Sequence, residues 1–241
     1  MIRCIASWSS GKDSAWMIHS LRARGHVEIG ALLTTVNEAA QRVAMHAVRI
    51  ELLHEQADAL GVPLWPVQIP SPCSNAIYES AMQETVARAV AEDFTHIAFG
   101  DLFLEDIRRY REERLAGSGL TPLFPLFGLD TAWLAREMIA SGLRARLTCV
   151  DPRVLDARFA GREFDDALLA ELPPSVDPCG ERGEFHTFAY DGPMFRHPIR
   201  VEPGEIVERD GFVFADLKPE RTRSPQRTQR TQRTKSSAVK G

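Results

Sequence analysis

Six consecutive residues, Ser9-Ser10-Gly11-Lys12-Asp13-Ser14, have the composition of a phosphate-binding loop. Lys12 is the only lysine among residues 1–217, so the chain places a compact ammonium here and uses arginine elsewhere. Apolar residues 2–6 precede the segment, and a helix-like pattern follows it. A turn between a strand and a helix directs backbone N–H groups at one point, where an anion binds. A capped helix start with a solvated lysine is the alternative, but the six residues together favour phosphate.

The spacing within this segment excludes two common phosphate-binding motifs. A Walker A loop has glycine five residues before its Gly-Lys pair and Ser or Thr directly after the lysine. Ala6 and Asp13 occupy those positions here. The dinucleotide pattern GxGxxG does not fit the segment either.

A second segment places a carboxylate after a predicted strand. Asp101 follows Gly100 at a strand end, so its carboxylate can face the same sheet edge as the lysine segment. There it could hold magnesium or orient an incoming group. Alternatively, Asp101 caps the next helix, and residues 108–112 form a solvated face with i,i+4 ion pairs.

A third segment, residues 177–188, combines glycines with carboxylates. Gly180 and Gly183 permit close backbone approach or positive φ. Glu181 and Glu184 adjoin them, so the loop could receive a cationic or amide-bearing substrate. A glycine-rich hairpin with exposed acids is the alternative. Cys179 could act as a nucleophile, although a structural thiol is favoured.

Apolar periodicity predicts the elements that position these segments. Strands are predicted over residues 2–6, 28–35, 64–69 and 95–99, and helices over residues 14–24, 44–60, 75–91 and 105–115. Repeated βα units predict an α/β fold with a doubly wound parallel sheet, which binds ligands at the carboxyl ends of its strands. The lysine segment and Asp101 therefore lie on one edge of the sheet.

The second half of the chain has a different pattern. The Pro/Gly-rich residues 121–128 predict a seam between domains. Beyond them we predict helices over residues 131–141 and 165–172, and strands over residues 144–150, 184–190, 196–201, 205–209 and 212–215, with a hairpin turn at Asp210-Gly211. This organisation predicts a first domain over residues 1–125, a smaller α+β domain over residues 126–219 and a disordered basic tail over residues 220–241.

Composition narrows the function classes. The chain is 44% hydrophobic and 26% charged, as in ordinary soluble globular proteins. The formal net charge is −4, but residues 221–241 contain seven basic residues and no acidic one, so residues 1–220 carry −11. An acidic body disfavours a large nucleic-acid footprint. The four cysteines form no CxxC pair. The sequence shows neither a secretory signal nor an apolar run of membrane-spanning length, so a cytoplasmic location is expected.

The three segments together resemble the diphthine–ammonia ligase family, which belongs to the N-type ATP pyrophosphatases of the PP-loop superfamily. Residues 9–14 are similar to the SGGKDS-like loop, with Ser10 in place of the usual second glycine. Residues 100–105 resemble a GD-x-x-x-E segment, and residues 180–187 resemble a GE-x-GE-[FY]-x-T segment in its bacterial form. Met45-His46 and residues 123–126 also resemble the family pattern, and the likeness spans about residues 1–217.

The resemblance implies a Rossmann-like, HUP-type ATP-binding domain and ATP-dependent amidation of a carboxylate. The implied ATP-binding residues are Ser9, Ser10, Gly11, Lys12, Asp13, Ser14 and Gly100. The implied substrate-binding residues are Glu105, Gly180, Glu181, Gly183, Glu184 and Thr187. The implied catalytic residues are Lys12, Asp13, Asp101 and Glu184, with Asp13 and Asp101 as candidate Mg²⁺ ligands. The family's substrate bears a quaternary ammonium, which suits the carboxylates of residues 181 and 184.

The implied partners are ATP, ammonia and a small-molecule or protein-borne carboxylate. No membrane partner is expected, and a homo-oligomer is compatible with the sequence. Two alternatives stay open at this point. One is an ATP pyrophosphatase or adenylating enzyme that acts on another small metabolite or on tRNA. The other is a non-catalytic adenine-nucleotide-binding protein.

Overall fold

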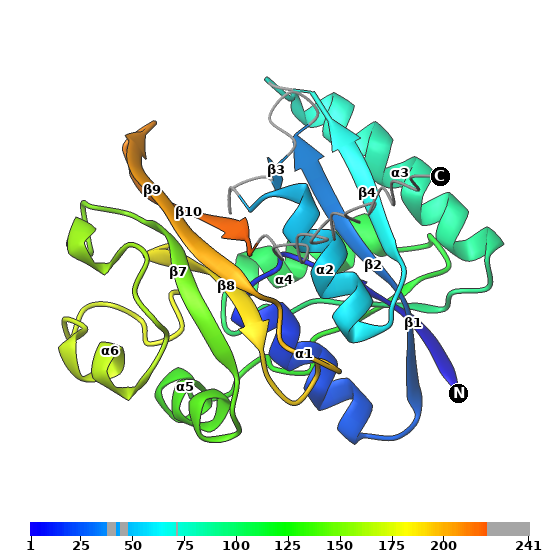
Figure 1. Ribbon diagram of the computed structural model, residues 1–241. Coiled ribbons are helices and arrows are strands. Elements are labelled where there is room, and N and C mark those ends of the chain that lie inside the picture. The colour runs from blue at the N-terminus through cyan, green and yellow to red at the C-terminus, as the bar shows by residue number, and fades with distance from the viewer. Residues whose placement is uncertain (38–41, 44–47, 71, 221–241) are drawn as a thin grey trace, which may run out of the picture.

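The computed structural model describes residues 1–37, 42–43, 48–70 and 72–220, and it contains two β-sheets with helices between and beside them (Figure 1). The strands of the first sheet are β1 (Ile2–Ser7), β2 (Val27–Asn37), β3 (Arg42–Val43), β4 (Leu64–Ile69), β5 (His96–Ala98) and β6 (Thr121–Leu123). Five of them run parallel in the order β4, β2, β1, β5, β6, and the short β3 pairs antiparallel with the end of β2. The strand order reverses direction at β1, which places a ligand-binding crevice between the ends of β1 and β5.

Helices cover both faces of this sheet. α1 (Lys12–Ala23) and α2 (Ile50–Leu60) lie on the face that turns toward the second sheet, and α3 (Asn75–Ala91) and α4 (Glu105–Leu115) lie on the other (Figure 1). The alternation along β1 shows this directly. Cys4 and Ala6 belong to the core that contains α1 and α2, whereas Ile5 packs in the core with Ala89 and Leu115. The predicted doubly wound α/β fold is confirmed.

The second sheet is antiparallel, with the order β8, β7, β10, β9. Its strands are β7 (Arg144–Val150), β8 (Phe185–Asp191), β9 (Val201–Arg209) and β10 (Phe212–Pro219), and the accompanying helices are α5 (Thr131–Ala140), η1 (Ala157–Phe159) and α6 (Asp166–Glu171). Asp210 and Gly211 have φ of 54° and 79°, as a type I′ hairpin requires, so the predicted turn is confirmed. The larger core includes residues of both sheets, so the two halves share one hydrophobic interior.

Several predicted elements differ from the structure. Residues 121–128 begin with β6, which pairs with β5 at the edge of the described sheet, and an edge strand tolerates Pro122. The strand predicted over residues 196–201 is wrong except for its last residue, because β9 begins at Val201; the strand predicted over residues 205–209 is the second half of β9. Ahead of β9, the Arg196 N–H donates to the Ala59 carbonyl (2.8 Å). This bond holds the chain against α2, so residues 196–200 do not join the sheet.

Some predictions lie outside the described residues. The predicted helix over residues 44–60 is described from Ile50 onward as α2, and Met45 and His46 are not covered. The same holds for residues 221–241 of the predicted tail. Within the described ranges, every helix is too short or too polar to cross a membrane.

One buried side chain joins the loop after β1 to both neighbouring elements. Gln56, on α2, is fully buried, and its amide nitrogen donates to the carbonyls of Ser10 (3.0 Å) and Ala189 (2.6 Å). Its amide oxygen accepts from Nε1 of Trp8 (3.0 Å). The Ala189 N–H donates to the same Ser10 carbonyl (2.9 Å). The loop is therefore fixed by α2 and by β8 before any ligand binds.

We predict that Gln56→Leu lowers the free energy of unfolding by about 2–3 kcal/mol, because it leaves Trp8 Nε1 and the Ala189 carbonyl buried without their partner. Urea denaturation followed by circular dichroism measures the change. Gln83→Leu, at an exposed position on α3, is the matched control and should change stability little. Equal effects of the two substitutions would contradict the role given to Gln56.

Candidate active site

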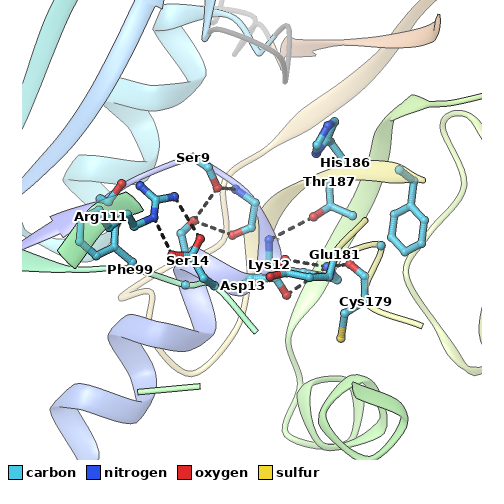
Figure 2. Close-up of a pocket in the computed structure, with 16 residues that line it drawn as sticks. Ser9, Lys12, Asp13, Ser14, Phe99, Arg111, Cys179, Glu181, His186 and Thr187 are labelled. Atoms are coloured by element: carbon cyan, nitrogen blue, oxygen red, sulfur yellow. Dashed lines mark hydrogen bonds and ion pairs between the residues drawn. The ribbon is translucent and has the colours of Figure 1, made fainter. Parts of the chain in front are cut away.

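The segment predicted to bind phosphate lies at the carboxyl end of β1, where it lines a cavity of about 240 Å³ (Figure 2). Three segments meet there: the loop from β1 into α1, the residues after β5, and the loop that leads into β8. The predicted site residues that line the cavity are Ser9, Gly11, Lys12, Asp13, Ser14, Gly100, Asp101, Gly180, Glu181 and Thr187. Ser10, Glu105, Gly183 and Glu184 are not among the lining residues.

The N-terminus of α1 opens toward this cavity. Its N-cap residue is Gly11, which has no side chain to accept from the first turn, so the N–H groups of that turn beyond Lys12 are left for an anion. The Lys12 N–H donates to Oγ1 of Thr187 (3.1 Å), and the hydroxyls of Ser9 and Ser14 lie 3.1 Å apart. A Cβ on Gly11 would lie 3.3 Å from the Thr187 carbonyl, so glycine here lets β8 approach the loop.

The Lys12 side chain is 2% exposed, which is unusual for an ammonium. Its Nζ lies 2.8 Å from Oδ2 of Asp13 and donates to the Cys179 carbonyl. The rings of Phe164 and Phe185 each have their centroid 5.4 Å from Nζ. Burial alone would lower the pKa of Lys12, but the nearby acidic groups, Asp13 first among them, raise the pKa above its usual value. Lys12 is therefore a charged, oriented cation.

Ser10 explains how the loop turns. It has φ of 70°, in the left-handed region that favours glycine, and it is fully buried. Among the described residues its hydroxyl has no hydrogen-bond partner. The turn is thus the one that the glycine of related loops would adopt without strain, and Ser10 adopts it under the constraint of the two bonds to its carbonyl.

Asp101 lies in the cavity, but its carboxylate is not free. Arg111 donates to it through Nε (2.6 Å to Oδ2) and Nη2 (3.0 Å to Oδ1), and the guanidinium lies 4.2 Å from the ring centroid of Phe99. The alternative interpretation of residues 108–112 included i,i+4 ion pairs, and Arg108 and Glu112 form one at 2.9 Å. Arg111 does not fit that alternative, because it lines the cavity. Phe99 and Arg111 were not predicted as site residues.

Two carboxylates hold the loop before β8 in shape. Oδ2 of Asp177 accepts from the N–H groups of Cys179 (3.2 Å) and Glu181 (3.0 Å). Glu184 is buried, and its two oxygens accept from the N–H groups of Asp177 (3.0 Å) and Arg182 (2.9 Å). The sequence predicts a substrate-facing catalytic role for Glu184, but the structure turns its side chain into its own loop, away from the cavity.

The glycines of this loop are required for different reasons. Gly180 has φ of 70°, and a Cβ there would lie 2.8 Å from the Phe185 carbonyl, so the loop folds tightly over the start of β8. Gly183 has φ of 86° and open space around it, so only its conformation matters. Glu105, also predicted to bind substrate, is an exposed residue in the first turn of α4 and lies outside the cavity.

Glu181 joins the two halves of the site. Its Oε1 accepts from the Leu102 N–H (2.7 Å), and burial raises its pKa to about 7, with further contributions from the charges of Asp13 and Asp101. The other titratable groups of the loop are less available. Burial raises the pKa of the Cys179 thiol, as expected of a structural thiol, and burial near Lys12 lowers the pKa of His186 to about 4.

The described residues contain no group of three or more His, Cys, Asp and Glu side chains that could hold a metal ion. The two predicted Mg²⁺ ligands each have a cationic partner, Lys12 for Asp13 and Arg111 for Asp101. Mg²⁺ commonly takes only one or two carboxylates and completes its shell with phosphate oxygens and water. The cavity is compatible with that mode, and Mg²⁺ binding stays a prediction.

We predict that Ser10→Gly is more stable than Ser10→Ala by about 1 kcal/mol, because both remove the buried hydroxyl but only glycine relieves the left-handed backbone. Chemical denaturation of the two variants measures the difference. Equal stabilities would show that the turn at residue 10 stores no strain.

Glu181 predicts a pH effect on stability. Its raised pKa means that its contribution is fully present below about pH 4.5 and is lost as the pH rises through about 7. Between about pH 5 and 8 the free energy of unfolding should therefore fall by roughly 1–2 kcal/mol more for the wild type than for Glu181→Gln, after discounting for partial exposure. Urea titrations across this range test it, with the exposed Glu208→Gln as control. Parallel profiles for wild type and Glu181→Gln would refute the assignment.

Comparison with known proteins agrees with the resemblance seen in the sequence. Family models described as the diphthamide synthase N-terminal domain and the diphthamide synthase C-terminal domain match residues 2–120 and 130–219. The diphthine–ammonia ligase of Danio rerio is 30% identical over 246 residues, which cover 90% of this chain and 92% of that protein. The diphthine–ammonia ligase of Homo sapiens is 28% identical over 243 residues, with 90% and 89% covered.

A solved structure shows a weaker likeness. It is described as a predicted subunit of tRNA methyltransferase from Methanocaldococcus jannaschii, and it is 16% identical, with a TM-score of 0.42 over 83% of this chain and 100% of that chain. That likeness is too distant to inform the function. The two family models and the relatives at about 30% identity are sufficient: the chain belongs to the diphthamide synthase family, whose matched relatives are diphthine–ammonia ligases.

Proposed function

We propose that this chain is an ATP-dependent carbon–nitrogen ligase that amidates a substrate carboxylate with ammonia, as the names of its relatives indicate for diphthine. One observation carries the proposal: a buried, charged Lys12 lies beside the open N-terminus of α1 at the carboxyl end of β1. Helix N–H groups and a compact ammonium are the groups that bind a polyphosphate. The chain's own donors therefore fit the phosphates of ATP.

The roles on the nucleotide side follow from this placement. Lys12, the N–H groups of the first turn of α1 and the hydroxyls of Ser9 and Ser14 would hold the leaving pyrophosphate. Donors aimed at the charge that develops on a leaving group stabilise the transition state more than the ground state. Mg²⁺, when bound, would neutralise further phosphate charge, and Asp13 and Asp101 are the residues that could contact it.

The proposed reaction has two steps. A carboxylate oxygen of the substrate attacks the α-phosphorus of ATP, the bond from that phosphorus to the bridging oxygen breaks, and pyrophosphate leaves with the electron pair. The lone pair of ammonia then attacks the acyl carbon, and AMP leaves with the electrons of the acyl–oxygen bond. This step releases a proton, and the Glu181 carboxyl, whose pKa is about 7, lies in the cavity to accept it. Glu184 and Asp177 act by holding the loop that carries Glu181.

The reaction products test the proposed chemistry. The full chain is incubated with ATP, Mg²⁺, ammonia and a protein extract that contains candidate acceptors, and the nucleotide products are separated. AMP with pyrophosphate supports attack on the α-phosphorus. ADP with phosphate contradicts it, and tight ATP binding without turnover in any extract would favour a nucleotide-binding protein.

We predict that Lys12→Ala weakens ATP binding at least about tenfold, because a buried charge at the phosphates is lost. Lys12→Arg should restore little, since a planar guanidinium is not a compact point charge and the site is closed around the ammonium. Isothermal titration with ATP measures both, and circular dichroism verifies folding. Lys218→Ala, at an exposed lysine on β10, is the control. Unchanged ATP affinity in a folded Lys12→Ala variant would refute the phosphate site.

A further inference from the structure

A second cavity adjoins the phosphate cavity. It has a volume of about 470 Å³, lies between α3 and α4, and shares two lining residues with the first cavity, Phe99 and Arg111. Figure 2 shows these two side chains at one end of the site, opposite Cys179 and Glu181. The groove stays open because α3 packs loosely: of its 17 residues only Ala89 is buried. A molecule in this second cavity would therefore reach the phosphate cavity at Arg111.

The walls of the α3–α4 cavity are mainly apolar. Met82, Val86 and Ile97 line it together with the rings of Tyr78 and Tyr110. Two of its charged groups pair with each other, since Arg114 forms an ion pair with Glu79 and lies over the Tyr110 ring at 5.3 Å. Such a cavity suits a bulky group covered with methyls, either a branched alkyl group or a quaternary ammonium, which also binds to aromatic faces.

Arg111 supplies the polar contact at the junction. Its Nε and Nη2 donate to Asp101, and the guanidinium lies over the Phe99 ring, so its position is fixed. Among the described residues, no hydrogen-bond partner lies at its Nη1. A fixed guanidinium with a free N–H edge matches the geometry of a carboxylate. The carboxylate would then lie at the edge of the cavity that holds the phosphates.

We infer that the α3–α4 cavity receives the methyl-rich part of the acceptor substrate, and that Arg111 positions the substrate carboxylate for attack on the nucleotide. The inference rests on the proposed function, because it places the carboxylate beside bound ATP. The shared residues Phe99 and Arg111 favour a substrate over a partner protein as the occupant, because they connect the groove to the reacting phosphates.

Three small probes test this assignment by ligand-observed NMR on the full chain with a non-hydrolysable ATP analogue bound. Glycine betaine has a carboxylate beside a quaternary ammonium, and choline has the same cation with a hydroxyl in place of the carboxylate. In tert-butylacetate the carboxylate is kept, but an uncharged carbon replaces the quaternary nitrogen. We expect at least one of the two acids to bind more tightly than choline by about fivefold or more.

Two matched tryptophan variants test the place of binding. Ala87 is exposed and lines the α3–α4 cavity, whereas Ser80 is exposed on the same helix and lines neither cavity. Ala87→Trp should fill the cavity and weaken binding of the acid about tenfold, while Ser80→Trp should leave it unchanged. Arg111→Gln should remove the preference for the acid over choline, a readout that loss of structure alone does not produce.

Three outcomes overturn the inference. In the first, neither acid binds wild type more tightly than choline. In the second, the Ala87→Trp variant binds the preferred acid as well as wild type does. In the third, the oligomeric mass of the Ala87→Trp variant changes while its acid binding does not. The last result would assign the groove to a protein interface. Affinity for the ATP analogue is measured in parallel. Normal nucleotide affinity with failed acid binding refutes this inference alone, whereas absent nucleotide binding refutes the proposed function.

Discussion

The buried ammonium of Lys12 is the interaction on which the rest of the site depends. An ammonium removed from water is strongly unfavourable unless neighbouring groups compensate its charge. The compensation comes from Asp13 within α1 and from the Cys179 carbonyl and the Phe185 ring in the second half of the chain. The phosphate loop therefore reaches its described geometry only when the antiparallel sheet packs against it. The hydrophobic core that the two sheets share holds them in contact, and so keeps these partners around the ammonium.

The elements that depend on local signals could be predicted from the sequence. The predicted bounds of α3 and α4 agree with the structure, and Ser74 caps α3 by accepting from the Ile77 N–H. The hairpin at Asp210-Gly211 is likewise encoded by residues that tolerate positive φ. β6 was missed because proline disfavours a strand in sequence-based prediction, whereas in the fold the segment becomes a strand by pairing with β5. The division into separate domains at residue 125 stays a prediction, since one core spans both halves.

Some site residues could likewise be predicted from local sequence, whereas others depend on contacts that only the fold creates. The lysine segment and Asp101 could be placed from sequence because each directly follows a parallel strand, and such strand ends meet at one edge. Arg111 was missed because nothing in the local sequence distinguishes it from Arg108, which pairs with Glu112 and lies over the Phe127 ring. Only the positions of Phe99 and Asp101 in the fold bring Arg111 to the cavity. Glu184 was given a substrate role from its motif, but the direction of its side chain depends on where the Asp177 and Arg182 N–H groups lie.

Three contacts within the cavity each join a residue from the first half of the chain to one from the second: Lys12 to Cys179, Lys12 to Thr187, and Leu102 to Glu181. Neither half carries a complete set of partners. A recombination event could replace one half of the chain with that of a distant relative. It would separate the Lys12 ammonium from the Cys179 carbonyl and the Glu181 carboxyl from the Leu102 N–H. The halves are therefore inherited as one unit, and substitutions on either side of these contacts are expected to covary across the family.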